Sequence, residues 1–191
     1  MALVFTQIAT MVGDLGLGPA LVQREEVERR HVATATTATL LSGIVLGALT
    51  AVAAWPVSAF YGEPRLRPLV VVLATTYVLR GIGGVPKELL RRAMRFRSFA
   101  AVSASSLVCS GAVGIALAVA GAGAWALVLS VVVENAVGAA VVAVVAWRAG
   151  VWGARLGFDR EAWRDLGRFG AYVSGVRLAY YGATNVDNLI V

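Results

Sequence analysis

The fifty residues from Ser98 to Trp147 read SFAAVSASSLVCSGAVGIALAVAGAGAWALVLSVVVENAVGAAVVAVVAW, and Glu134 is the only charged residue among them. A membrane-spanning helix needs about 20 mostly apolar residues, so this stretch is long enough for two. Gly121 and Gly123 divide it at the point where two antiparallel helices need a tight reversal. The stretch therefore predicts a transmembrane helical hairpin.

The composition of the whole chain is that of a membrane protein. Of the 191 residues, 59% are hydrophobic and 15% are charged, whereas soluble domains have about 45–50% and about 25%. We expect an all-α, polytopic transmembrane helix bundle of about six spans. The expected spans are Ala2–Val22, Val32–Phe60, Leu66–Pro86, Ser98–Ala120, Ala124–Trp147 and Phe169–Val191.

Positive charge alternates between the connections of these spans. The connections after the first, third and fifth spans hold 13 Arg and Lys residues, and the alternate connections hold only Arg65 and Arg67. Because positive residues mark cytoplasmic loops, this asymmetry predicts the orientation of a multi-pass protein in the cytoplasmic membrane. The chain would then begin outside and end within an apolar run at Val191, so we expect a fragment of a larger protein. The net charge of +6 does not indicate a nucleic-acid partner, because the basic residues lie mainly in connections.

Two of the basic connections have helical patterns. The stretch Lys87–Arg97 is amphipathic, which suits a helix in the headgroup layer, an extension of the third span, or charge that only sets topology. Further along, Asp159 is a plausible N-cap for a surface helix on which Trp163, Leu166 and Phe169 share one face.

The polar residues do not indicate an enzyme. Cys109 is the only cysteine and His31 the only histidine, which excludes an intrachain disulfide, a Cys-rich metal site and any site that needs two histidines. No connection holds an acidic cluster of the kind that membrane-embedded transferases use. We expect no catalytic residue, metal or cofactor.

Several segments, in order, resemble a known family. They are Asp14-Leu-Gly-Leu-Gly-Pro-Ala-Leu-Val-Gln23, Phe60-Tyr-Gly-Glu-Pro64, Gly84-Val-Pro86 with the basic stretch Leu89–Phe96, Arg168-Phe-Gly-Ala-Tyr172 and Asn185-Val-Asp-Asn-Leu-Ile-Val191. The first three look like the first half of the Wzx-like polysaccharide or oligosaccharide flippases, which belong to the multidrug/oligosaccharidyl-lipid/polysaccharide exporter superfamily. The last two resemble the first helix of that family's second half.

The resemblance implies a two-lobed, MATE-like transporter that moves undecaprenyl-diphosphate-linked sugars across the membrane, often coupled to an ion gradient. On that template, residues 1–150 are most of the first lobe, with the family's first helix missing. Residues 151–168 are a cytoplasmic interfacial linker helix, and residues 169–191 are the truncated first helix of the second lobe.

Two intramembrane arginines are candidates for binding the substrate. A charge at the centre of a span costs about 2.5–3.5 kcal/mol on insertion scales, so each needs a partner, water or a role. Guanidinium groups bind phosphate oxygens with paired hydrogen bonds, which suits a lipid-linked diphosphate. Arg177 lies about nine residues into the last span, roughly 13 Å deep at the helical rise, and we expect it to face a cavity. Arg80 lies close enough to the end of its span either to snorkel or to contact substrate.

Four further polar residues are candidates for ion coupling or for structural roles within the membrane. Glu134 is either a proton-coupling site, because an unpaired carboxylate in an apolar span takes up a proton, or an interhelical partner of an arginine. Asp14 precedes helix-breaking residues and is either a cap or a functional group. Asp187 and Asn185 form a polar patch near the end of the last span, at an interface or in a site.

The leading functional hypothesis is a lipopolysaccharide or polysaccharide biosynthesis transporter that flips lipid-linked oligosaccharide by alternating access. Its expected partners are the lipid-linked oligosaccharide, membrane lipids, and the polymerase and glycosyltransferases of the same pathway. The alternatives are a MATE-type drug exporter, a peptidoglycan lipid-precursor flippase and, from another class, a non-transporting membrane scaffold of a polysaccharide assembly complex.

Overall fold

A computed structural model describes residues 17–23, 27–153 and 156–184. Every regular element among these residues is an α-helix, which confirms the all-α prediction. The helices are α2 (Leu17–Gln23), α3 (Arg29–Phe60), α4 (Leu66–Arg92), α5 (Phe96–Val119), α6 (Ala124–Arg148) and α7 (Arg160–Thr184).

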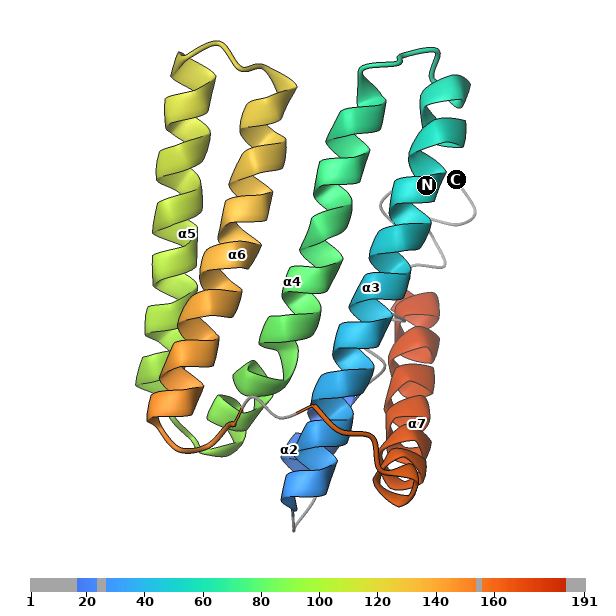
Figure 1. Ribbon diagram of the computed structural model, residues 1–191, viewed down its shortest axis with the longest axis vertical. Helices are drawn as coiled ribbons and strands as arrows, with labels where there is room; N and C mark the ends of the chain where they lie inside the picture. The colour runs from blue at the N-terminus through green and yellow to red at the C-terminus, as the bar shows by residue number, and fades with distance from the viewer. Residues whose placement is uncertain (1–16, 24–26, 154–155, 185–191) are drawn as a thin grey trace.

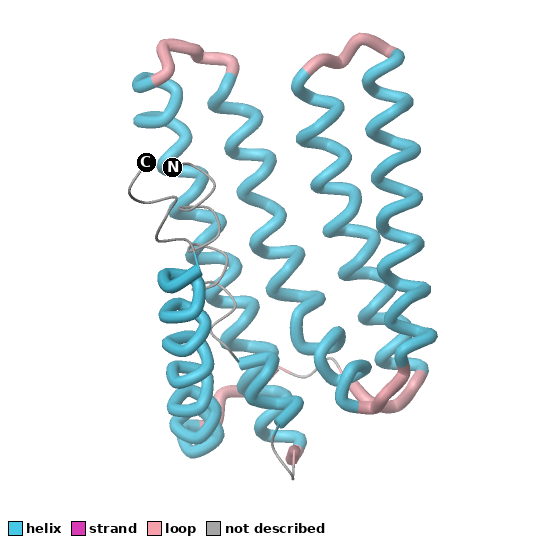
Figure 2. Tube along the Cα trace, turned by 180° about the vertical axis from the view of Figure 1, so that it is seen from behind, coloured by secondary structure: helices cyan, strands magenta, loops and turns pink. Residues whose placement is uncertain are grey.

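The four long central helices form two antiparallel hairpins, α3–α4 and α5–α6, which meet where α4 packs against α6 (Figure 1). The turns at 61–65 and 120–123 lie at one end of the bundle. The start of α3, the end of α4 and the connections 93–95 and 149–153 lie at the other, which we call the basic end (Figure 2). The arginine-rich and arginine-poor connections therefore lie at opposite ends, as the charge pattern predicts.

Four described helices, α3 to α6, are long and apolar enough to cross a membrane, which confirms a multi-pass bundle. The first expected span, Ala2–Val22, lies outside the described residues except for its last part in α2. The sixth, Phe169–Val191, is described only to Thr184 and belongs to α7, which already begins at Arg160. The count of six spans therefore stays a prediction.

The turn between α5 and α6 is the reversal that the sequence predicts. Gly121 and Gly123 have φ angles of 78° and 56°, a left-handed conformation that glycine adopts without steric cost. The N–H of Ala122 bonds back to the carbonyl of Leu117 at 2.9 Å, so this turn also satisfies the end of α5.

The stretch Lys87–Arg97 is not a separate helix. Helix α4 continues through Pro86 to Arg92, so the extension of the third span is the interpretation that the structure supports up to that residue. The chain then turns at Met94, which has a φ of 54°, and α5 starts at Phe96. The stretch is therefore not one amphipathic helix, because this corner divides it between the end of α4 and the start of α5.

Glycines let α3 and α4 touch along their backbones. A Cβ atom on Gly43 would stand 2.5 Å from the carbonyl oxygen of Tyr77, and one on Gly81 would stand 2.7 Å from that of Thr39. The hydroxyl of Thr39 also donates to the carbonyl of Gly81 at 3.2 Å. Close approach of this kind drives helix association where no hydrophobic force acts between helices in lipid.

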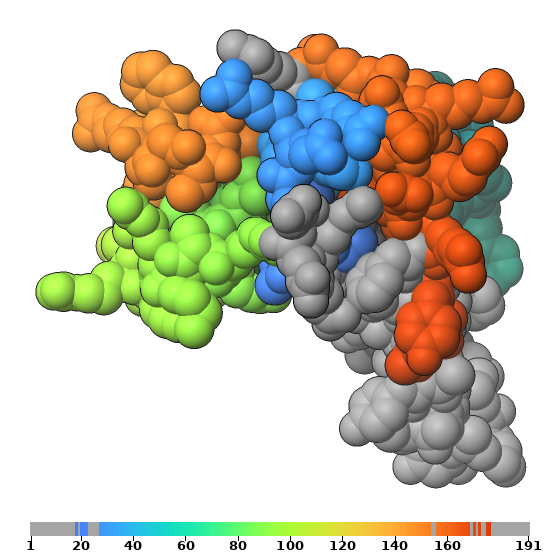
Figure 3. All heavy atoms as spheres, turned by 90° about the horizontal axis from the view of Figure 1, so that it is seen from below, coloured from blue at the N-terminus to red at the C-terminus, as the bar shows by residue number. Residues whose placement is uncertain are grey.

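The buried core lies towards the basic end. One cluster joins α2, α3, α4 and α7 and consists of Ala20, Leu21, Ala35, Ala38, Val85, Leu89 and Leu166. A second joins α4, α5 and α6 and consists of Leu90, Val102, Val142 and Ala146. Seen from the basic end, α3 lies between the first turns of α7 on one side and the ends of α4 and α6 on the other (Figure 3). Large apolar side chains elsewhere on α3, α5 and α6 are exposed, as expected for surfaces that face lipid.

The start of α7 confirms one local prediction. The Asp159 carboxylate accepts hydrogen bonds from the N–H groups of Glu161 and Ala162, at 3.0 and 2.8 Å, so Asp159 caps the helix as predicted. Of the three residues expected to share a face, Leu166 is buried, Trp163 is 37% exposed and lies against Phe158, and the side chain of Phe169 is not described. Ala162, four residues before Leu166, is also fully buried.

Candidate functional site

A cavity of about 430 Å³ lies among α2, α3, α4, α5 and α6. Glycines and small side chains form much of its wall, and polar side chains from four helices line the rest. The polar lining consists of Thr39, Ser42, Tyr77, Arg80, Lys87, Glu88, Ser103, Ser106, Glu134 and Asn135. Two of the candidates from the sequence, Arg80 and Glu134, therefore line the same cavity, although they lie on different hairpins.

Arg80 is anchored across the cavity by an amide. Its Nε donates to Oδ1 of Asn135 at 3.0 Å, and Nδ2 of Asn135 donates to the carbonyl of Val131 at 2.8 Å. This second bond fixes the amide so that its oxygen faces the guanidinium. A guanidinium has five N–H donors in a planar fork, so this contact orients the group and leaves donors for an anion in the cavity.

Glu134 is exposed and borders the cavity next to Asn135. Within the part of the chain that the structure describes, it forms no ion pair, and the arginine nearest to it in the lining bonds to Asn135 instead. Sequence reasoning missed Asn135. The signal was present, because an amide inside a Val-rich span also needs a hydrogen-bonding partner.

The cavity reaches towards the basic end through Lys87 and Glu88. The Glu88 side chain is 16% exposed and accepts a hydrogen bond from Nη1 of Arg91 at 3.2 Å. A Cβ atom on Gly18 of α2 would stand 2.7 Å from Cγ of Glu88, so a larger residue there would require the Glu88 side chain to shift. Lys87 Nζ and Arg91 Cζ each lie 5.4 Å from the ring centroid of Phe99, within the range of cation–π attraction.

The other sequence candidates are not placed by the structure. Arg177 lies on α7, but its side chain is not described. Asp14, Asn185 and Asp187 lie outside the described residues. Among the residues that are described, no group of three His, Cys, Asp or Glu could hold a metal ion.

These features define a multi-pass membrane protein with a polar cavity between two helical hairpins. The chain belongs to the polysaccharide biosynthesis protein family, whose model matches residues 1–191. This membership and the relatives below confirm the resemblance to Wzx-like proteins seen in the sequence.

Three curated proteins illustrate the family. The chain is 26% identical over 187 residues to the teichuronic acid biosynthesis protein TuaB of Bacillus subtilis (strain 168), covering 97% of this chain and 38% of TuaB. It is 29% identical over 134 residues to the succinoglycan biosynthesis transport protein ExoT of Rhizobium meliloti (strain 1021), covering 70% of this chain and 27% of ExoT.

The third relative is the lipopolysaccharide biosynthesis protein WzxC of Escherichia coli (strain K12), 24% identical over 197 residues, covering 100% of this chain and 38% of WzxC. The chain therefore spans well under half the length of the curated relatives that it matches. No solved structure matches it.

Proposed function

We propose that this chain is the first-lobe part of a transporter that flips undecaprenyl-diphosphate-linked oligosaccharide across the cytoplasmic membrane by alternating access. Its family and its similarity to ExoT, a succinoglycan biosynthesis transport protein, and WzxC, a lipopolysaccharide biosynthesis protein, support a role in moving polysaccharide precursors. The observation that carries the proposal is a cavity-lining guanidinium, Arg80, oriented across two hairpins by Asn135.

The chemistry of the cargo fits this cavity. A lipid-linked diphosphate is doubly anionic, and a guanidinium binds phosphate oxygens more directionally than an ammonium does. Lys87, nearer the basic end, supplies a second positive charge along the same cavity. With the basic end in the cytoplasm, the diphosphate enters past Lys87 and binds at Arg80. The sugars occupy the polar lining of Thr39, Ser42 and Ser106.

The proposal also includes five further residues: Glu134, Arg177, Asp14, Asp187 and Asn185. Glu134 borders the cavity, so a proton that it carries can respond to whichever side the cavity faces. We assign Arg177 to the same cargo, because it lies on the helix that leads towards the second lobe. The remaining three residues keep the intramembrane polar roles that the sequence predicts.

The experiment uses the full-length protein in a strain that lacks its own flippase, with surface polysaccharide as the readout and membrane abundance measured in parallel. Arg80→Ala should abolish the restored polysaccharide without lowering abundance, and Arg80→Lys should restore part of it. Arg65→Ala is the matched control, because Arg65 is exposed in the turn at the opposite end of the bundle. Full activity of Arg80→Ala, or a loss that only follows abundance, would refute the assignment of Arg80.

The variant Asn135→Asp distinguishes a role of Arg80 in binding cargo from a role in holding the two hairpins together. The carboxylate would keep the acceptor 3.0 Å from Nε of Arg80 and add a charge-assisted bond, which is stronger than the neutral one. The variant also loses the Nδ2 donor that bonds to Val131, so we expect its membrane abundance to stay near that of the parent and its transport to fall, because the carboxylate competes with phosphate for the guanidinium. A variant that is as abundant as the parent and transports normally would show that Arg80 does not bind cargo.

A further inference from the structure

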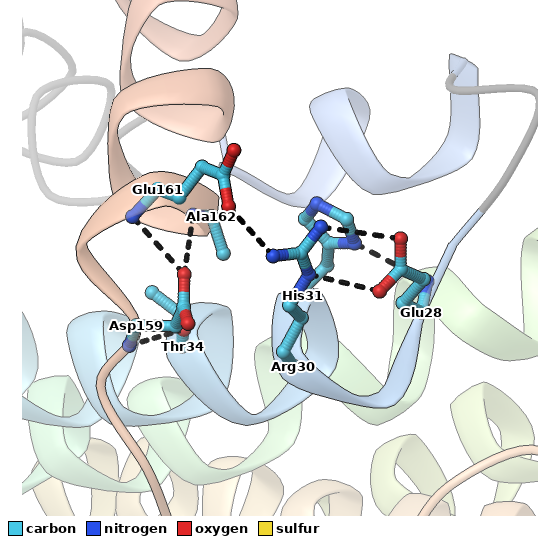
Figure 4. A network of polar contacts seen from close by, with 7 residues as sticks. All are labelled: Glu28, Arg30, His31, Thr34, Asp159, Glu161 and Ala162. Atoms are coloured by element: carbon cyan, nitrogen blue, oxygen red, sulfur yellow. Dashed lines mark hydrogen bonds and ion pairs between the residues drawn. The ribbon is translucent and has the colours of Figure 1, made fainter.

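A set of polar contacts fastens the segment before α7 onto the first turns of α3 (Figure 4). The Thr37 hydroxyl accepts the N–H of Gly157 at 3.0 Å, and the Thr34 hydroxyl accepts the N–H of Asp159 at 3.1 Å. Thr34 is fully buried. These threonines lie three residues apart on one face of α3. They therefore bind the backbone of residues 157–159 in one fixed register.

Arg30, one turn before Thr34, continues the same row. Its Nη1 donates to Oε2 of Glu161 at 2.8 Å, and its Nε donates to Oε2 of Glu28 at 2.8 Å. Glu28 is itself held in the capping box of α3, where its N–H bonds to Nδ1 of His31 at 3.2 Å. The guanidinium thus joins the caps of two helices whose starts are about 130 residues apart in sequence. We call this row of contacts, from Arg30 to Thr37 on α3 and from Gly157 to Glu161, the α3 clamp.

The N-terminal cap of α7, Asp159, lies within the α3 clamp and is ionised. The Ala162 N–H, which bonds to the Asp159 carboxylate, holds the pKa of that carboxyl below its usual value, and the Glu161 N–H and nearby Arg30 act in the same direction. Asp159 is therefore ionised when it caps α7, and its backbone N–H is bound to buried Thr34 at the same time. A single residue thus connects the cap of α7 to the side of α3.

Apolar burial continues the attachment for one and a half turns of α7. Ala162 is fully buried, and Leu166, 1% exposed, belongs to the cluster that includes Ala35 and Leu89. Among the later side chains of α7 that the structure describes, Tyr172 is 71% exposed and Val176 is 52% exposed, whereas Gly170 is buried. The contacts with α3 described above therefore cover residues 157–166.

We propose that residues 157–166 move as one rigid body with α3, and that the α3 clamp stays closed while the cavity opens to alternate sides. The movement of α7 is then absorbed after Leu166. The consequence for transport rests on the proposed function, whereas the rigid attachment itself does not. The competing possibility is a gate in which the exposed Arg30–Glu161 pair breaks in every cycle, since exposed ion pairs are weak.

A disulfide across the α3 clamp distinguishes a rigid attachment from a gate that opens in every transport cycle. The variant carries Ala33→Cys with Gly157→Cys in the full-length protein, with Cys109→Ser to remove the native thiol. Position 157 accepts a side chain, because a Cβ atom there would meet only Cβ of Ala33 at 3.5 Å, an ordinary contact. We expect the oxidised protein to cross-link, as measured by mass spectrometry, and to transport as well as the reduced protein. Loss of transport on oxidation and recovery with reductant would overturn the proposal. Each single-cysteine variant, oxidised in the same way, is the control.

Spin labels give a readout that does not depend on transport. Arg29 on α3 and Arg164 on α7 are both exposed, and the distance between labels there should stay narrow and unchanged when vesicles are loaded with lipid-linked oligosaccharide. The distance from Arg29 to a label at Val176 should change or broaden. A shift in the Arg29–Arg164 distance, or a broad distribution together with failure to cross-link, would contradict the α3 clamp. If the parent protein does not transport at all, the proposed function fails, and the spin-label distances still decide whether the clamp is rigid.

Discussion

Replacing Gly81 by alanine tests whether backbone contact between α3 and α4 holds the bundle. A methyl group at this position would lie 2.7 Å from the Thr39 carbonyl oxygen and 3.1 Å from Cα of Leu40. Both are backbone atoms that can move only if the helices separate. Overpacking of this kind costs about 1–3 kcal/mol, and the better helix propensity of alanine returns about 1 kcal/mol. We expect a net loss of about 0–2 kcal/mol for Gly81→Ala.

Gly84→Ala is the matched control. It lies three residues further along the same helix, and a Cβ atom there would meet nothing within 4 Å. Only the propensity gain applies, so this variant should be more stable than the parent by up to about 1 kcal/mol. The two variants should therefore differ by about 1–3 kcal/mol, the overpacking term alone.

Reversible unfolding of the purified protein in mixed micelles, followed by tryptophan fluorescence and circular dichroism, measures this difference. Equal shifts for Gly81→Ala and Gly84→Ala would refute the reasoning, because they would show that the α3–α4 contact yields without cost. Shortening the side chain of Thr39 or Leu40 should not restore the stability of Gly81→Ala, because the atoms that the new methyl group meets belong to the backbone of these residues.

The remaining predictions concern the α7 cap, Glu134 and the orientation. The N–H of Ala162 lowers the pKa of Asp159 in the folded protein. The ionised cap therefore stabilises the fold above the usual carboxyl pKa of about 3.9, and this stability is lost as the pH falls through the lower folded pKa. In unfolding titrations, Asp159→Asn should keep the cap and lose this acid dependence, whereas Asp159→Ala should lose both the cap and the acid dependence. Glu134→Gln should retain basal flipping in vesicles but lose its response to an imposed pH gradient, and a normal response would eliminate Glu134 as the coupling site. Reporter fusions near Arg92 should indicate the cytoplasm and those near Ala122 the exterior, and the reverse pattern would contradict the topology.

The fold was accessible from the sequence wherever the deciding signal is local. The apolar length of Ser98–Trp147 predicts a hairpin whatever surrounds it, and Gly121 and Gly123 mark its turn because few other residues adopt their φ angles. The Asp159 cap is equally local, since its partners lie two and three residues away. The expected span Leu66–Pro86 is shorter than α4, which continues past Pro86 to Arg92.

Only some of the site residues could be predicted from the sequence, because the geometry of the site depends on contacts between segments that are distant in sequence. The cost of a charge in lipid identifies Arg80 and Glu134 individually, but nothing in the sequence shows that Arg80 bonds to an amide 55 residues away. Nor does it show that Thr34 and Thr37, which look like ordinary polar residues within an apolar helix, bind the backbone of the segment before α7. Helix periodicity gives the face of a residue and not the partner of that face.

Three contacts join four of the described helices, α3, α4, α6 and α7, and this bears on how the cavity can move. Thr39 binds Gly81 between α3 and α4, Arg80 binds Asn135 between α4 and α6, and Thr34 binds the residue that caps α7. The first and third involve buried or tightly packed backbone, whereas the second joins two side chains that line the cavity. Under the proposed function, a diphosphate that draws the guanidinium away from Asn135 would remove a polar link between the two hairpins, while the apolar cluster of Leu90, Val102, Val142 and Ala146 would still join them. The bond from Arg80 to Asn135 is then the contact between the hairpins that cargo binding alters directly.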